Sequence, residues 1–287
     1  SGSFLGTFYD LSDSTISTLE RGVLGISLDP DFSVNHYIYV YYNHFYNNDE
    51  RIRILRFTES ANTGTNPVVI FDLPAFDTIH GHVGGNLHFR PSQPNHIYFT
   101  IGDLLYQQTD PALNYANKIT NPFGKVLRIK KDGSIPTDNP FYDDGNALAA
   151  NCDWIWSYGH RNPFDFCFSP VNDSLYCSEN GMFYWDEVNL ISKGLFYGWA
   201  QCEGNYMNSS NTSLCNDPSA QLPITDFGAP LPAVTGILFY SGTTWSSLNN
   251  HLLVADNNNG NIYDCTLGNP PFYNVVTNRA LLGDMTI

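Results

Sequence analysis

Positive charge is scarce in this sequence of 287 residues. Lys and Arg number 13 and Asp and Glu number 28, so the formal net charge is −15. A surface of this sign repels phosphate backbones, and we therefore expect no nucleic-acid partner. Long apolar runs are also missing: no stretch approaches the roughly 20 residues of a membrane span, which predicts that the chain has no transmembrane segment. No signal peptide is visible, so the sequence is interpreted as a mature or partial chain.

Cysteine pairs of the CxxC type are absent, which argues against a zinc ribbon. The six Cys residues are an even number, and an oxidising compartment would join them as disulfides. The expected pairs are Cys167 with Cys177 across a turn, Cys202 with Cys215 around a polar loop, and Cys152 with Cys265 as the remainder. The alternative is a set of buried free thiols, because Cys is often simply a core residue. Disulfides would make the protein a secreted, extracellular one.

Three sequons for N-glycosylation are present, at Asn172, Asn208 and Asn211. The last two fall in the Cys-bracketed loop at about residues 202–215. N-linked glycans are carried on the surface loops of secreted proteins. The sequence therefore predicts a glycosylated surface loop.

Helical periodicity is almost absent. Short runs rich in aromatic and β-branched residues recur instead, separated by Gly, Pro, Asn and Asp, and such runs predict strands. The clearest runs are residues 37–42, 53–57, 68–71, 85–89, 96–101 and 125–129. The expected fold class is all-β.

These runs belong to a longer sequence repeat. Each copy has an apolar strand, a polar turn and a second strand, and the copies cover residues 25–40, 86–99, 165–177 and 235–256. This recurrence is typical of propeller blades, whereas a β-sandwich, the alternative, does not predict a repeated two-strand unit. We expect one propeller domain over residues 1–287. Its ring would be incomplete at both ends of the chain, so that missing sequence, another chain or self-assembly would cover the open ends.

Three polar segments could form one site. Residues 157–164 carry Arg161 and Asn162, and a guanidinium beside an amide can bind carboxylate or quinone oxygens. Residues 80–87 place His82 among glycines, where a ligand can approach the backbone and a His can take a proton. Asp103 follows a predicted strand, and an Asp bonded to a His fixes the tautomer of the ring. The alternative for each is an ordinary loop or packing residue.

Together with several longer phrases, these segments resemble the soluble pyrroloquinoline-quinone-dependent glucose dehydrogenases, their sorbosone and aldose sugar dehydrogenase relatives, and the hedgehog-interacting-protein-like branch. The resemblance runs from about Gly22 to Asp284. The phrases that carry it are Gly22-Val23-Leu24-Gly25-Ile26, Asn121-Pro122-Phe123-Gly124-Lys125, Asp132-Gly133-Ser134-Ile135-Pro136, Tyr158-Gly159-His160-Arg161-Asn162-Pro163 and Asp186-Glu187-Val188-Asn189.

The resemblance implies a six-bladed propeller of four-stranded antiparallel blades that oxidises a sugar or related alcohol. His82 matches the family's catalytic base, and Asp103 matches the acid that supports it. Arg161 and Asn162 match residues that contact the quinone. The backbone carbonyls of Gly181 and Met182 match the ligands of the cofactor's calcium, and Glu187 with the Tyr197 backbone matches a second calcium site, since hard cations prefer oxygen ligands.

Two departures from the family pattern set up a competing hypothesis. The late turn at residues 256–261 has no Lys or Arg, although the family supplies a cation there, and Asn86 stands where the family is often basic. The first hypothesis is an extracellular oxidoreductase that uses the quinone and calcium. The second is a catalytically inactive, glycosylated propeller that serves as a structural or binding module of the extracellular matrix.

Overall fold

The computed structural model of the chain describes residues 3–74, 81–107, 109–208, 213–268 and 275–282. Strands dominate this part of the chain, and four antiparallel sheets of four strands contain nearly all of them. The helices are short: α1 (Phe32–Asn35) and the 3₁₀ helices η1 (Ser12–Ser14), η2 (Tyr115–Asn117) and η3 (Ser246–Leu248). Within the described residues, no helix has the length and apolar character required to cross a membrane.

The strands of each sheet follow one another in chain order, apart from one inserted hairpin. The first sheet contains β1 (Val23–Leu28), β2 (Tyr37–Tyr46), β3 (Asp49–Ser60) and β4 (Thr63–Pro74). The second contains β5 (Leu87–Arg90), β6 (Gln93–Ile101), β7 (Lys125–Lys130) and β8 (Ile155–Tyr158). The third contains β9 (Pro163–Phe168), β10 (Leu175–Glu179), β11 (Trp185–Ile191) and β14 (Thr225–Gly228), with the hairpin β12 (Cys202–Glu203) and β13 (Tyr206–Met207) between the last two. The fourth contains β15 (Val234–Tyr240), β16 (His251–Asp256), β17 (Ile262–Leu267) and β18 (Val275–Leu282).

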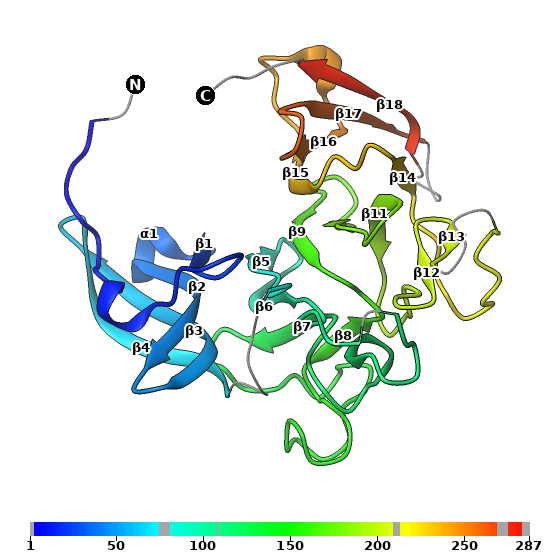
Figure 1. Cartoon of the computed structure of the whole chain (residues 1–287). Helices are drawn as coiled ribbons and strands as arrows, with labels where there is room; N and C mark the ends of the chain where they lie inside the picture. The colour runs from blue at the N-terminus through cyan, green and yellow to red at the C-terminus, as the bar shows by residue number, and fades with distance from the viewer. Residues whose placement is uncertain (1–2, 75–80, 108, 209–212, 269–274, 283–287) are drawn as a thin grey trace.

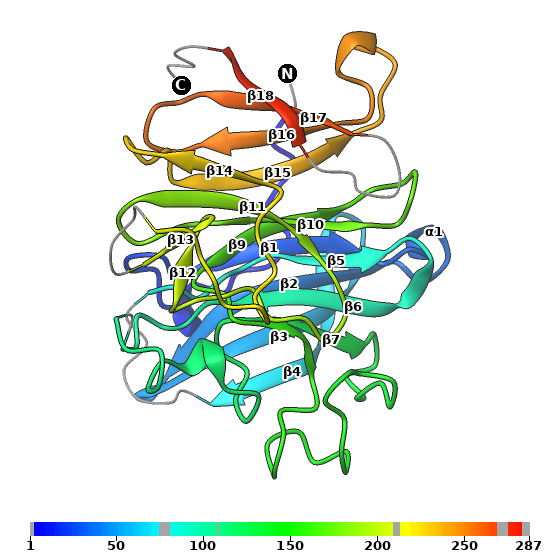
Figure 2. The ribbon, with the colours of Figure 1, turned by 90° about the vertical axis from the view of Figure 1, so that its right-hand side faces the viewer.

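The sheets follow an arc around a common centre, in chain order from β1 to β18 (Figure 1). The first strand of each sheet lies on the inner side, where β1 neighbours β5, β5 neighbours β9, and β9 neighbours β15. Figure 2 shows the same sheets from the side, with α1 and the β12–β13 hairpin on opposite sides of them. Segments that end an inner strand therefore converge on the centre.

The predicted repeat corresponds to this architecture. Its four copies are the inner strand pairs β1–β2, β5–β6, β9–β10 and β15–β16. Tight turns join later strands where the sequence permits a left-handed backbone, as at Asn47 and Asn48 between β2 and β3, since Asn tolerates positive φ in two-residue hairpin loops. The prediction of an all-β chain built from repeated strand pairs is confirmed.

Aromatic and branched side chains fill the space between neighbouring sheets. One cluster joins the first two sheets and includes Tyr39, Tyr41, Phe71, Phe99 and Leu127. The tyrosine run at residues 37–42 is thus mostly packing, because Tyr39, Tyr41 and Tyr42 are all buried. A second cluster joins the third and fourth sheets.

The cysteines correct part of the sequence-based prediction. The Cys202–Cys215 disulfide is present, but Cys152, Cys167, Cys177 and Cys265 are buried free thiols. The pairing register explains the error for two of them: Cys167 lies opposite Tyr176, and Cys177 lies opposite Phe166. Because neighbouring residues of a strand face opposite sides of the sheet, this offset of one residue separates the two thiols. Cys152 and Cys265 belong to different core clusters.

This arrangement predicts the result of a thiol titration. The native protein should react slowly or not at all with a disulfide reagent such as DTNB, because the four thiols are buried and burial raises the pKa of each of them. In guanidinium chloride four thiols should react, and six after reduction. If only two thiols react in the unfolded, unreduced protein, one of the two other predicted bridges is present. If none reacts, both are present.

The sequons have distinct surroundings. The Asn172 side chain accepts a hydrogen bond from the Ser174 backbone N–H at 3.1 Å. The Asn208 side chain donates to the Ala200 carbonyl at 3.3 Å. Asn211 lies outside the described residues. Glycosylation of all three remains a prediction.

Candidate active site

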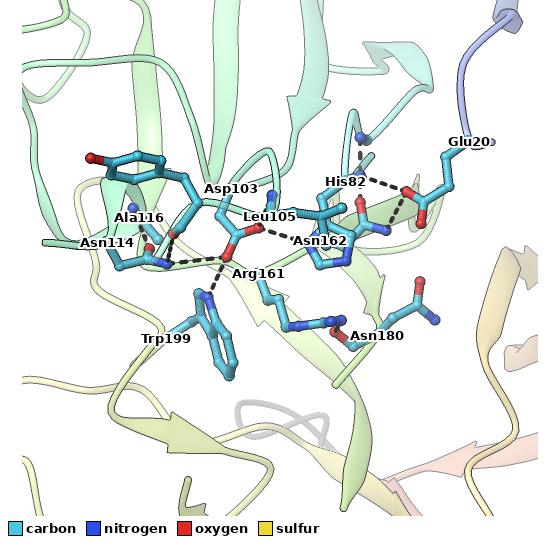
Figure 3. A network of polar contacts seen from close by, with 12 residues as sticks. Glu20, His82, Asp103, Leu105, Asn114, Ala116, Arg161, Asn162, Asn180 and Trp199 are labelled. Atoms are coloured by element: carbon cyan, nitrogen blue, oxygen red, sulfur yellow. Dashed lines mark hydrogen bonds and ion pairs between the residues drawn. The ribbon is translucent and has the colours of Figure 1, made fainter. Parts of the chain in front are cut away.

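A buried His–Asp pair joins the segment before β5 to the segment after β6 (Figure 3). His82 comes from the glycine-rich segment before β5, and Asp103 follows β6. His82 Nδ1 is 2.7 Å from Asp103 Oδ1, and the two residues are 4% and 0% exposed. With Nδ1–H directed at the carboxylate, Nε2 is the ring nitrogen that can accept a proton from a ligand. The sequence-based pairing of His82 with Asp103 therefore has the geometry it needs.

The Asp103 carboxylate is held by three further donors. The Leu105 backbone N–H donates to Oδ1 at 3.0 Å. The Trp199 indole N–H and the Asn114 side-chain amide donate to Oδ2 at 2.7 and 3.2 Å. A carboxylate that accepts this many hydrogen bonds has little freedom to rotate, so the orientation of the His82 ring is fixed as well.

Gly102 lets the site segments approach one another. The Asp103 backbone N–H donates to the Arg161 carbonyl at 2.7 Å, and the Gly124 N–H donates to the Gly102 carbonyl at 2.8 Å. A Cβ at position 102 would overlap the His82 carbonyl oxygen and lie 2.9 Å from the Arg161 carbonyl oxygen. Only glycine therefore allows these backbones to pack at this distance.

Arg161 lies beside the pair, and its guanidinium bonds to the segment that follows β10. Its Nη1 donates to the carbonyls of Asn180 and Gly181 at 3.0 and 2.7 Å, and its guanidinium carbon lies 5.5 Å from the centre of the Trp199 ring. Burial lowers the pKa of Arg161. The guanidinium thus donates a hydrogen bond to the Gly181 carbonyl, which the resemblance assigns to calcium as a ligand.

Glu20 is a site residue that the sequence reasoning missed. Its Oε2 accepts the His82 backbone N–H at 2.7 Å and the Asn162 side-chain amide at 3.2 Å. The side-chain oxygen of Asn162 (Oδ1) in turn accepts the Gly84 N–H at 3.4 Å. Glu20 therefore positions the loop that carries His82. Its sequence signal is its place two residues before the phrase that begins at Gly22.

Buried carboxylates gather behind Arg161. The Asn189 amide donates to Glu179 Oε2 at 3.2 Å and to Glu187 Oε1 at 2.7 Å. Glu203 Oε1 accepts three backbone N–H groups, whereas Glu203 Oε2 and Asn189 Oδ1 are buried without a hydrogen-bond partner among the described residues. Burial raises the pKa of Glu187 well above its usual range. Among the described residues, the buried oxygen atoms of this cluster thus outnumber the hydrogen-bond donors that meet them.

The other predicted ligands surround this cluster. Gly181 and Met182 lie in the turn between β10 and β11, and Met182 packs against the cluster that contains Trp199. The Tyr197 ring stacks on His160 with centroids 4.7 Å apart, and the Tyr197 backbone N–H donates to the Tyr158 carbonyl at 2.9 Å. His160 Nδ1 is 2.8 Å from Glu179 Oε2. The predicted cofactor and metal residues thus converge on one region.

The turn at residues 256–261 is organised around the Asp256 carboxylate. The Asp256 carboxylate accepts hydrogen bonds from Asn259, Asn261 and Tyr263 at 3.0–3.2 Å. It therefore adds amides and one carboxylate, but no positive charge, to its surroundings.

Lys125 donates hydrogen bonds within the loop that begins at Asp103. Its burial predicts that the stability of the protein depends on pH. Its buried ammonium donates to the carbonyls of Tyr115, Ala116 and Phe123 at 2.5–3.1 Å, and burial lowers its pKa from 10.5 to about 7. Between these pH values the unfolded chain binds a proton that the folded chain releases. The free energy of unfolding should therefore rise with pH across this window, by at most about 1.4 kcal/mol per unit.

Urea unfolding at several pH values between 7 and 10 would test this. Lys125→Met should lower stability, because it leaves three carbonyls without their donor, and should also remove this part of the slope. Lys130→Met, at an exposed position, is the matched control and should keep the slope. Equal slopes in all three proteins would contradict the prediction.

Four-stranded sheets around a centre that contains a buried His–Asp pair define a propeller-type protein with a polar central site. The sequence profile of the glucose/sorbosone dehydrogenase family matches residues 9–286. The chain belongs to this family. The resemblance inferred from its sequence phrases is thereby confirmed.

Two curated relatives and one solved structure illustrate the relationship. Quinoprotein glucose dehydrogenase B of Acinetobacter calcoaceticus is 35% identical over 223 residues, which are 70% of this chain and 44% of that protein. An aldose sugar dehydrogenase of Escherichia coli K12 is 26% identical over 244 residues, 82% of this chain and 62% of that protein. The PQQ-bound aldose sugar dehydrogenase of Streptomyces coelicolor has the same fold, with a TM-score of 0.75 at 22% identity over 96% of this chain and 71% of that chain. The chain spans about half the length of the curated relatives it matches.

Proposed function

We propose that this chain is the part of a secreted sugar dehydrogenase that carries the catalytic base. The enzyme would oxidise an aldose or a related alcohol. The observation that carries the proposal is the buried His82–Asp103 pair, whose 2.7 Å contact directs Nε2 away from the carboxylate. His82 Nε2 would take the proton from the hydroxyl of the substrate as its C–H bond is broken. Pyrroloquinoline quinone, when bound, would supply the acceptor for the hydride.

On the side of the site that contains Arg161, the residues around the His82–Asp103 pair fit such a cofactor. Arg161 offers a buried guanidinium, which suits the carboxylates and oxygens of an anionic quinone. Asn162 offers an amide, and the carbonyls of Gly181 and Met182 would face its calcium once Arg161 released Gly181. The turn at residues 256–261 adds no cation, so we expect weaker binding than in relatives that have one; each missing charge-assisted hydrogen bond costs about 1.5–3 kcal/mol.

Calcium fits the buried carboxylates. Glu179 and Glu187 share one amide donor, and Glu203 Oε2 and Asn189 Oδ1 have no partner among the described residues. A hard divalent cation coordinated by oxygen would favour ionised carboxylates here and satisfy such atoms. Glu187 and the Tyr197 carbonyl are the proposed ligands.

The wider proposal concerns the complete protein. We infer a six-bladed propeller in which the four sheets are four of the blades, supported by the greater length of the relatives. The Cys202–Cys215 disulfide supports an oxidising, extracellular location.

A reconstitution experiment tests the enzymatic function. The purified full-length protein is mixed with pyrroloquinoline quinone and calcium, titrated by absorbance, and assayed with a panel of aldoses and a dye acceptor. We expect saturable quinone binding and sugar-dependent dye reduction. The absence of both would overturn the proposal.

An inactive binding or structural module is the second candidate. The lack of Lys and Arg in the turn at residues 256–261 favours it, and so do the exposed apolar side chains of Ile26 and Leu28 on β1, which could meet a protein partner or a second copy. This candidate predicts calcium-dependent stability without quinone binding, so the same titration separates the two functions.

A further inference from the structure

We propose that a groove outside the His82 site binds a neutral oligosaccharide. The groove consists of two adjoining cavities of about 470 and 400 Å³ that share Pro111 and Gln201 in their walls. Each volume lies within the range of roughly 300–1,000 Å³ that is common for small-ligand sites. Two such cavities in succession suit a chain of several sugar rings better than a single ring.

The chemistry of the walls points to a polyhydroxy ligand. The first cavity combines the aromatic side chains of Phe183 and Tyr184 with the amides of Gln201 and Asn208. Aromatic rings can pack against the C–H face of a sugar, and an amide offers both a donor and an acceptor to hydroxyl groups. Phe183 is 55% exposed, so its ring is accessible.

The charge of the groove selects for a neutral ligand. The described residues that line the two cavities include no Lys or Arg, and Asp217 is their one carboxylate. With a chain net charge of −15, a phosphorylated or acidic sugar would be repelled. An uncharged oligosaccharide has no such penalty.

Two of the segments that line the groove are held by hydrogen bonds or by a disulfide. Glu203 Oε1 accepts the backbone N–H groups of Phe183 and Tyr184 at 2.8 and 2.7 Å, which holds the backbone that carries the aromatic pair. The Cys202–Cys215 disulfide closes the segment that carries Asn208. A site with little left to order binds with a smaller entropy cost.

Two chain segments that line the groove also carry residues that hydrogen-bond to the His–Asp pair. Trp199 directly precedes Ala200, which lines the first cavity, and Asn114 belongs to the loop that supplies Pro111. Trp199 and Asn114 both donate to Asp103 Oδ2. An oligosaccharide in the groove would therefore contact segments that orient Asp103, but binding itself does not depend on catalysis.

Calorimetric titration tests the proposal with cellohexaose, maltohexaose and mannohexaose as neutral probes, hexagalacturonate as an acidic probe, and glucose and mannose as single rings. We expect at least one neutral hexasaccharide to bind about tenfold or more tightly than its monosaccharide, and hexagalacturonate to bind more weakly. Phe183→Ala and Gln201→Ala should each weaken that binding by about tenfold. Tyr46→Ala, which removes another exposed aromatic side chain, is the matched control and should bind as the wild type does.

A His82→Gln variant separates this inference from the proposed enzymatic function. It should lose any turnover and keep its affinity for the hexasaccharide. The groove proposal is overturned if no neutral hexasaccharide binds, if Phe183→Ala and Tyr46→Ala have equal affinities, or if the groove binds only peptides in a parallel titration with an apolar peptide library.

Discussion

Replacing His82 by Gln should lower kcat for sugar oxidation by about a hundredfold to ten-thousandfold, the usual contribution of a positioned general base. Gln can preserve a hydrogen bond to Asp103, but its side-chain amide cannot accept a proton at neutral pH as an imidazole can. The quinone affinity of the variant should change much less, because the proposed cofactor contacts lie at Arg161, Asn162, Gly181 and Met182. Steady-state kinetics with the reconstituted protein, combined with a quinone titration, measure the two effects separately.

His36→Gln is the matched control for this variant. His36 also lies beside a carboxylate, with Nδ1 3.1 Å from Glu59 Oε2, but its side chain is 51% exposed. Its replacement should leave turnover unchanged. Unaltered kcat in His82→Gln would remove the assigned base, while an equal loss in both variants would indicate a general effect on folding.

Alanine at position 102 should damage both stability and the site. The added Cβ would overlap the His82 carbonyl and approach the Arg161 carbonyl oxygen to 2.9 Å, and both neighbours are backbone atoms that cannot rotate away. Overpacking of this kind costs about 1–3 kcal/mol, occasionally more. We expect a loss of this size in urea unfolding, together with a marked fall in kcat, because relief of the overlap must move His82 or Asp103.

Gly236→Ala provides the comparison for the Gly102 variant. Gly236 lies in β15, and a Cβ there would meet no atom closer than 3.9 Å. Its replacement should change the free energy of unfolding by less than about 1 kcal/mol and leave turnover intact. If Gly102→Ala were as stable and active as Gly236→Ala, the close approach of the site segments would not be needed for function.

The strand architecture was predictable because its signals are local. Alternating apolar residues, turn residues and a recurring strand pair all lie within a few tens of residues, and each copy of the repeat became the inner pair of one sheet. The cysteines show where local reasoning ends. The symmetric placement of Cys167 and Cys177 about a turn predicts that they lie opposite each other. The register differs from this by one residue, which places the two thiols on opposite faces of the sheet.

The candidate site was predictable only in part, for a related reason. His82, Asp103, Arg161 and Asn162 stand in recognisable phrases. The groups that position them come from distant segments: Trp199 is 96 residues from Asp103, and Glu20 is 142 residues from Asn162. Such contacts arise from the arrangement of the sheets around the centre, which no local pattern specifies.

The outward order of the strands also has a practical consequence. The site is built at the inner strands, whereas the turn between β3 and β4 joins the two strands of the first sheet that are farthest from that centre. Its residues Ala61 and Asn62 are exposed. An affinity tag, a fluorescent label or an immobilisation linker placed there would leave the chemistry of the centre untouched, which makes this turn the natural attachment point on the protein.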